Sequence, residues 1–287
     1  MHGQIATLLL LLPLASLADG VSRFATLDGS KVHYVSYGSG DRAVVFIHGW
    51  TCDASFWQAQ APVYETTRSL LIDLPGHGQS DKPEIPYTMD LFARAVDAVM
   101  TDAGVTKATL AGHSMGTPVI VRFLQMHPDK VAGLVFVDGF VPQPPKDDAA
   151  RERVKAQMDA MVKAARAPDY KAGLPAMLAG MFTPRTDPLL RERIELTMLA
   201  APQYVSASAR EGMTAMSLTG LTERYPAMPA IAVMVKRGTS DPYRDFLKQH
   251  FQLVDFVEFD NSGHFVMMEQ PAKFNAVLRQ FLERKTQ

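Results

Sequence analysis

Short apolar runs recur along this chain, and most of them are continuous rather than alternating in polarity. A strand with one face in water alternates apolar and polar residues, whereas a continuous run indicates a strand covered on both faces. Segments with helical spacing separate the runs, for example residues 88–104, which open with the capping candidates Thr88 and Asp90. The pattern predicts a largely parallel sheet with crossover helices, to which residues 31–38, which do alternate, add an antiparallel strand. The continuous runs are residues 43–49, 69–76, 108–114, 133–139, 230–238 and, less purely, 254–260.

One stretch, residues 141–228, contains no strand-like run and has helical spacing instead. It opens with a proline-marked amphipathic segment, and further helical pieces are expected near 187–200 and 202–218. We predict a helical cap subdomain here. Half of the chain's 16 methionines lie in it, and they either pack the core of the cap or line a pocket for an apolar substrate. These residues are Met158, Met161, Met177, Met181, Met198, Met213, Met216 and Met228.

Composition excludes several classes of function. The chain has 287 residues, with 29 Lys and Arg against 30 Asp and Glu, and no basic run that would suggest a nucleic-acid partner. No Cys and His spacing typical of a metal site is present, so neither a metal nor another cofactor is expected. The single cysteine, Cys52, rules out an internal disulfide and is expected to fill a small buried space.

The first 18 residues resemble a secretory signal peptide. They contain an apolar stretch from Ile5 to Leu17 and small residues at Ser16 and Ala18, as in a cleavage site, although no Lys or Arg precedes the stretch. The stretch is too short to span a bilayer comfortably. We therefore expect cleavage after residue 18, a secreted or periplasmic protein and no stable membrane insertion, with an uncleaved anchor or a different start as alternatives. The remaining residues divide into a core domain, 19–140 with 229–287, and the cap, 141–228.

A serine between two glycines carries the main chemical indication. Ser114 lies in the stretch Gly112-His113-Ser114-Met115-Gly116, between a predicted strand and a predicted helix. A nucleophilic hydroxyl must project from the edge of the sheet, so the backbone turns sharply and side chains at both neighbouring glycine positions would clash. The same turn directs the first amides of the helix toward a carbonyl under attack.

At this point the sequence resembles the α/β-hydrolase family over residues 23–140 and 229–284. Beyond the serine, the resemblance rests on the order of four other motifs. These are "FIHGW" (46–50), "DLPGHGQSD" (73–81), "GTSD" (238–241) and "NSGHFVMMEQP" (261–271). The order Ser, Asp, His along the chain is the one that this family uses.

The resemblance implies a role for each matching residue. Ser114 is the expected nucleophile, His264 the general base and Asp241 the acid that orients it, with Asp138 as the alternative acid because it also follows a strand. The main-chain N–H groups of Trp50 and Met115 are the expected oxyanion donors.

Other residues near these motifs are candidates for the substrate pocket. They are His48, Phe140, Met181 and Met213, although Phe140 and Trp50 could instead plug the core beneath the cap. His48, His113 and His77 are otherwise expected to order loops rather than to react.

The resulting prediction is an α/β fold with about eight mostly parallel strands and a helical cap between the sixth and seventh strands. We expect a serine hydrolase of the carboxylesterase type, acting on small to medium, mainly apolar acyl esters. A nucleophilic serine disfavours the dehalogenase and epoxide-hydrolase branches of the family, which attack with Asp. Lactones, amides, thioesters or carbon–carbon bonds remain alternative substrates, and a ligand-binding receptor with incidental hydrolysis is a more distant alternative.

Overall fold

The computed structural model describes residues 20–236 and 241–284, and it describes the backbone but not the side chain of Asp241. The predicted signal segment, residues 1–18, lies outside the described residues.

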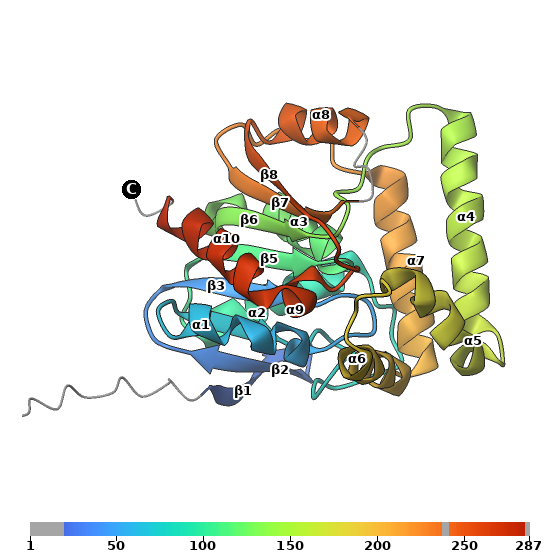
Figure 1. Cartoon of the computed structure of the whole chain (residues 1–287), viewed down its shortest axis with the longest axis horizontal. Helices are drawn as coiled ribbons and strands as arrows, with labels where there is room; N and C mark the ends of the chain where they lie inside the picture. The colour runs from blue at the N-terminus through green and yellow to red at the C-terminus, as the bar shows by residue number, and fades with distance from the viewer. Residues whose placement is uncertain (1–19, 237–240, 285–287) are drawn as a thin grey trace, which may run out of the picture.

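Eight strands of the described chain form one sheet in the order β1-β2-β4-β3-β5-β6-β7-β8 (Figure 1). The pairs β1–β2 and β2–β4 are antiparallel, and every other pair is parallel. The predicted fold, a mostly parallel eight-stranded sheet, is confirmed. The strands are β1 (Val21–Leu27), β2 (Ser30–Tyr37), β3 (Arg42–Ile47), β4 (Ser69–Ile72), β5 (Lys107–His113), β6 (Val131–Val137), β7 (Pro229–Val235) and β8 (Leu253–Phe259).

The alternating segment forms β2, as predicted, and it pairs with a strand that the pattern did not single out. β1 precedes it in a hairpin whose two-residue turn consists of Asp28 and Gly29, with φ of 50° and 83°. Both turn residues therefore adopt the left-handed conformation, which Asp-Gly turns accommodate well. The hairpin adds two antiparallel strands to one edge of the parallel sheet.

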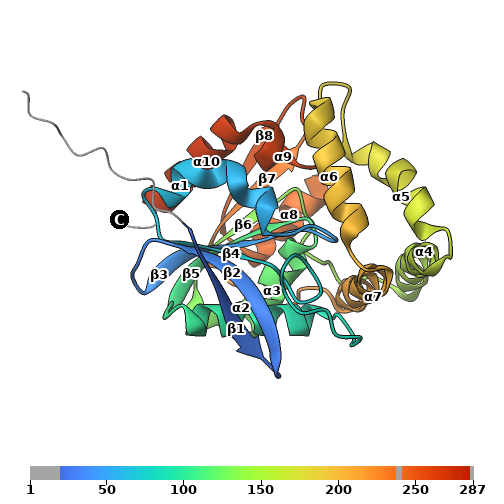
Figure 2. The same ribbon diagram turned by 90° about the horizontal axis from the view of Figure 1, so that it is seen from below.

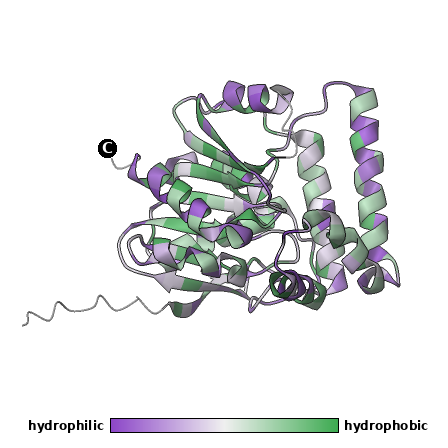
Figure 3. Ribbon diagram, viewed as in Figure 1, coloured by the Kyte–Doolittle hydropathy of each residue, from purple (hydrophilic) through white to green (hydrophobic). Residues whose placement is uncertain are grey.

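Helices cover both faces of the sheet. Helices α1 (Ala61–Tyr64) and α10 (Pro271–Glu283) lie on one face, and α2 (Met89–Asp102) and α3 (Gly116–Met126) lie on the other (Figure 2). This cover explains the mainly hydrophobic colouring of the central strands (Figure 3). Every residue of β4, for example, is buried. As predicted, Thr88 caps α2, because its side chain accepts a hydrogen bond from the Leu91 N–H at 3.1 Å.

The chain between β6 and β7 forms four α-helices that stand beside one end of the sheet (Figure 1). The first of them, α4, is mostly exposed and packs along α7, while α6 and α7 match the predicted helical pieces. Both expectations for the methionines hold for part of the set: Met198 and Met216 are buried in the core, whereas Met158 and Met161 line a cavity. The cap helices are α4 (Asp148–Arg166), α5 (Tyr170–Leu178), α6 (Pro188–Ala200) and α7 (Gln203–Thr219).

The remaining helices lie between these elements along the chain. They are the short 3-10 helices η1 (Ala54–Gln60), η2 (Pro128–Lys130) and η3 (Ala179–Met181), and the α-helices α8 (Asp241–His250) and α9 (Val266–Glu269). Within residues 20–236 and 241–284, no helix has both the length and the apolar character needed to cross a membrane.

Candidate active site

Ser114 sits on a tight turn between β5 and α3, and its φ is +52°. A non-glycine residue rarely adopts this conformation, and it is held here by close packing of the main chain. A Cβ atom on Gly112 would lie 2.4 Å from the carbonyl oxygen of Gly116, and one on Gly116 would lie 2.5 Å from the carbonyl oxygen of Ile47. The two glycines that flank the serine in sequence are therefore required by sterics, as predicted.

His264 follows β8 in a loop that is fixed at both of its main-chain polar groups. Its N–H donates to the carbonyl oxygen of Met181 in the cap at 2.7 Å. Its carbonyl oxygen accepts from Nε2 of His113 at 3.0 Å. The His264 ring carries Nδ1 at 2.6 Å from Oδ2 of Asp138, and both side chains are largely buried. A carboxylate accepts only, so Nδ1 is the nitrogen that donates in this hydrogen bond.

The acid that contacts His264 is thus Asp138, which the sequence analysis gave as the alternative to Asp241. Asp138 directly follows β6, which is the neighbour of β5, and its own φ of +40° turns its side chain toward the histidine loop. Its second oxygen, Oδ1, accepts from the N–H of Val235 at 3.1 Å. Asp241 is the first residue of α8, and its side chain lies outside the described part of the structure.

The two predicted oxyanion donors belong to segments on either side of the serine. Trp50 follows β3, and Met115 precedes the first residue of α3. Both residues line the same cavity as Ser114. Among the hydrogen bonds of the described residues, neither the Trp50 nor the Met115 main-chain N–H is a donor. The indole N–H of Trp50 donates to the carbonyl oxygen of Ser206 in α7 at 2.8 Å, which ties this loop to the cap.

A cavity of about 480 Å³ opens between the sheet edge and the cap, and both Ser114 and His264 line it. Three of the four predicted pocket residues, Phe140, Met181 and Met213, also line it. The fourth, His48, does not, and this prediction is corrected: its ring is fully buried behind the loop. The reason is local, because its Nδ1 donates to the carbonyl oxygen of Gly49 at 2.8 Å and its Nε2 accepts from the Leu74 N–H at 3.0 Å.

The buried histidines near the site are neutral supports. Burial lowers the pKa of His48, and burial together with the neighbouring His264 lowers that of His113 to about 3. Burial likewise lowers the pKa of His77 to about 3, and its Nδ1 donates to the carbonyl oxygen of Pro75 at 2.9 Å. Cys52 is buried, as expected, and burial raises the pKa of its thiol.

The sequence matches the alpha/beta hydrolase family over residues 44–277. The chain belongs to the alpha/beta hydrolase family. It is 28% identical to the AB hydrolase superfamily protein YisY of Bacillus subtilis, with 84% of this chain and 91% of that protein covered. It is 26% identical to the 2-hydroxy-6-oxononadienedioate/2-hydroxy-6-oxononatrienedioate hydrolase of Burkholderia vietnamiensis, with 88% and 91% covered. Among solved structures, Est816, described as an N-acyl homoserine lactone degrading enzyme, aligns with a TM-score of 0.72 at 25% identity and covers 90% of this chain and all of its own.

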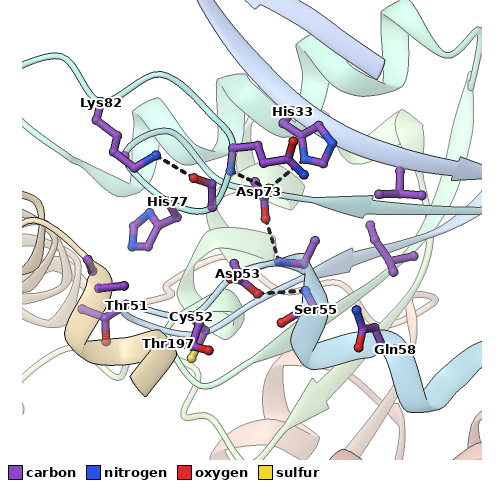
Figure 4. A pocket seen from close by; sticks show the side chains of 18 of the residues that line it. His33, Thr51, Cys52, Asp53, Ser55, Gln58, Asp73, His77, Lys82 and Thr197 are labelled. Carbon is purple, nitrogen blue, oxygen red and sulfur yellow. Dashed lines mark hydrogen bonds and ion pairs between the residues drawn. The ribbon is translucent and has the colours of Figure 1, made fainter. Parts of the chain in front are cut away.

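The hydrolase also contains a second cavity, of about 360 Å³, next to the motif at residues 73–81 (Figure 4). Burial alone would raise the pKa of Asp73, but hydrogen bonds from His33 and from the N–H groups of Gln79 and Ala54 lower it below its ordinary value. The ammonium group of Lys82 is also hydrogen-bonded within this loop, since its Nζ donates to the carbonyl oxygens of Gly78 and Ser80. The polar groups of this motif therefore hold the loops beside the oxyanion segment in place.

One charged residue that lines the cavity with Ser114, Arg210 of α7, was not predicted from the sequence. A signal was present, because Arg210 lies three residues before Met213 and four before Thr214, on one face of a predicted helix. Burial lowers the pKa of its guanidinium, but an arginine stays protonated at neutral pH. In the described part of the hydrolase, no group of three or more His, Cys, Asp or Glu side chains is arranged to hold a metal ion.

Proposed function

We propose that this hydrolase cleaves carboxylic esters through an acyl-enzyme intermediate on Ser114. The observation that carries the proposal is the Asp138–His264 pair on the wall of the cavity that also presents Ser114. A free serine hydroxyl is a poor nucleophile at neutral pH and needs an adjacent base, and a base needs a partner that fixes its orientation.

The hydrogen bond to Asp138 assigns the roles of the two ring nitrogens in this mechanism. Because Nδ1 of His264 donates its hydrogen to the carboxylate, Nε2 is the nitrogen that accepts a proton. In the proposed first step, Ser114 Oγ attacks the ester carbonyl and its proton passes to Nε2. The resulting imidazolium is stabilised by the negative charge of Asp138, which itself stays ionised.

The carbonyl oxygen gains negative charge as the tetrahedral intermediate forms. In the proposal, the main-chain N–H groups of Trp50 and Met115 donate to it, each worth about 3 kcal/mol of transition-state stabilisation. Collapse breaks the ester C–O bond, and His264 returns the proton to the leaving alcohol. Water, deprotonated by the same nitrogen, then attacks the acyl-enzyme, and the acid is released with Ser114 restored.

The walls of the cavity support small to medium acyl groups with a mainly apolar body. A volume of about 480 Å³ accommodates a ligand of modest size, and most of the lining side chains are apolar. The apolar side chains are Trp50, Met115, Pro118, Phe140, Val141, Pro142, Val154, Met158, Met161, Met181 and Met213.

The names of the relatives favour a second candidate, hydrolysis of a different bond by the same residues. The relative from Burkholderia vietnamiensis is named for an oxo-dienedioate and Est816 for an N-acyl homoserine lactone. A shared fold does not choose between these substrates. Parallel assays with an ester, a lactone and an oxo-acid distinguish them, because the preferred bond has the highest kcat/KM.

Replacing the nucleophile tests the proposal directly. We expect wild-type protein to hydrolyse p-nitrophenyl esters with an initial burst of about one equivalent of p-nitrophenolate per active site when deacylation is the slower step. Ser114→Ala is expected to lower kcat by about 10⁴-fold or more, because the covalent route is lost.

Ser39→Ala, which changes an exposed serine in the turn after β2, is the matched control and should retain full activity. With p-nitrophenyl esters of increasing acyl chain length, kcat/KM should fall once the acyl group is too long for the cavity. Unchanged turnover by Ser114→Ala would remove this serine from the mechanism and contradict the proposed function.

A further inference from the structure

Helix α7 presents one row of side chains to the catalytic cavity. Met213, Thr214 and Ser217 lie three, four and seven residues after Arg210 and so share one face of this helix, and all four line the cavity that contains Ser114 and His264. Among the described residues of the lining, Arg210 is the one arginine or lysine. A permanent positive charge therefore faces the reacting groups from the cap side.

The guanidinium of Arg210 is held in place by contacts that include no counter-ion from the described residues. Its Cζ lies 3.7 Å from the centroid of the Trp50 ring, so the guanidinium rests against the face of the indole. Its Nη2 donates to Sδ of Met177 at 3.3 Å, and a thioether is a weak acceptor. Its Nε is buried and has no hydrogen-bond partner among the residues that the structure describes.

Arg210 and the nearby Arg166 differ in whether an acidic side chain pairs with them. No carboxylate of the described residues lies within ion-pair distance of Arg210, although Glu211 is next to it in sequence. Glu211 points away from the cavity and pairs with the exposed Arg166 at 2.5 Å. In the described part of the chain, the exposed Arg166 therefore has an acidic partner, whereas Arg210 on the cavity wall, where the loss of hydration is more costly, has none.

We propose that Arg210 binds a carboxylate of the substrate, so that the hydrolase acts on esters whose apolar body carries an acid group. A planar guanidinium on an aromatic ring is preorganised for two parallel hydrogen bonds to a carboxylate. The methionine-rich walls of the cavity enclose the apolar part of the same molecule. This inference rests on the proposed ester hydrolysis and names the substrate class within it.

The kinetic test compares charged and neutral esters of the same acyl length. The charged series consists of mono-p-nitrophenyl esters of succinate, glutarate and adipate, and the neutral series consists of p-nitrophenyl esters of the straight-chain acids with equal carbon number. We expect wild-type kcat/KM to be about tenfold or more higher for the best charged ester than for its neutral counterpart. Arg210→Gln should lower kcat/KM for the charged ester about 10- to 100-fold and leave the neutral ester within about threefold.

Two further variants separate charge recognition from a structural effect. Arg210→Lys keeps the charge but loses the paired geometry, and it should be intermediate on the charged esters only. Arg166→Gln removes a cation that does not line the cavity and should leave both series unchanged. An equal loss on both series in Arg210→Gln, or a wild-type preference for neutral esters, would overturn the proposal.

A binding measurement keeps this inference distinct from the proposed reaction. Titration calorimetry of monoethyl glutarate against Ser114→Ala should show binding that weakens about tenfold or more in Ser114→Ala/Arg210→Gln and in high salt. Binding of this kind without turnover in wild-type protein would reject ester hydrolysis and retain the anion site. Equal binding to both variants would reject the anion site itself.

Discussion

At the scale of single residues, two residues of the candidate site have a strained backbone conformation. Ser114 and Asp138 have φ of +52° and +40°, and each directly follows a buried parallel strand. Such conformations cost about 1–3 kcal/mol each when the residue is not glycine. The contacts that maintain them, the close approach of Gly112 to Gly116 and the N–H···O bond from Asp138 to Val233, belong to the rigid sheet edge.

The sequence predicted Ser114 and His264 as site residues because their neighbours in the chain repeat the motifs of the family. The acid was harder to identify, because Asp138 and Asp241 both follow strand-like runs. Only the order of strands distinguishes them: β6 lies directly beside β5, and that order is not written in local composition. Arg210 was missed for a related reason, since the absence of an acid near it depends on three-dimensional packing.

The acid assignment predicts opposite results for two matched substitutions. Asp138→Asn should lower kcat by about 10⁴-fold, because an amide cannot hold the required tautomer of His264 or stabilise its charged form. Asp241→Asn should leave kcat within about threefold, since Nδ1 of His264 already donates to Asp138. Steady-state kinetics on one p-nitrophenyl ester measures both.

Circular dichroism of the two variants confirms that each is folded before its activity is compared. Loss of activity in Asp241→Asn alone would return the role of the acid to Asp241.

At the scale of elements, the cap and the oxyanion segment are joined through one side chain. Trp50 donates from its indole to Ser206 in α7, carries Arg210 over its ring and contacts Tyr170 of α5 edge-on. The main-chain N–H of the same residue is the proposed oxyanion donor. Helical periodicity in the sequence predicted α6 and α7, but it gave no information on this contact, which joins residues 156 positions apart.

We expect Trp50→Phe to reduce kcat about fivefold with a smaller change in KM. The ring and most of the packing remain, but the hydrogen bond to Ser206, worth about 1 kcal/mol, is lost and the loop is less well held. Kinetics with a neutral p-nitrophenyl ester measures the effect without involving the charge of Arg210.

Trp57→Phe is the matched control, because Trp57 is fully buried in the core and its indole N–H has no partner among the described residues. Its kcat should stay within twofold of wild type. A larger fall in kcat for Trp57→Phe than for Trp50→Phe would contradict a specific role for the bond to the cap.

At the scale of the whole molecule, the buried histidines make stability depend on pH. His77 has a pKa of about 3 in the folded protein against an ordinary value of 6.5, so the unfolded chain binds its proton first as the pH falls. The contribution of neutral His77 is therefore complete above pH 6.5 and is lost progressively between 6.5 and 3. His48 and His113 act in the same direction.

The free energy of unfolding should accordingly decrease from pH 7 to pH 4.5, and it should decrease less in His77→Gln. The difference between the two proteins over this interval is expected to be on the order of 2 kcal/mol. Urea denaturation at the two pH values measures this difference. For each protein, the change in the free energy of unfolding between the two pH values is compared, so a destabilisation that is the same at both pH values cancels.

Asp73 does not interfere in that interval, because its folded pKa lies below its ordinary value of 3.8 and its stabilising contribution is lost only at lower pH. Identical pH slopes for wild type and His77→Gln would show that His77 is protonated in the folded protein.

The register between β5 and β6 sets the relative positions of the residues that follow these two strands at the sheet edge. His113 is aligned with Val137, so the residues that follow the two strands, Ser114 and Asp138, leave the sheet at the same level. A slip of one residue would move one of them by about 3.3 Å and reverse the side to which it points. Insertions or deletions inside these two strands should thus abolish turnover even where the chain still folds, whereas length changes in the exposed turn at residues 38–40 should be tolerated.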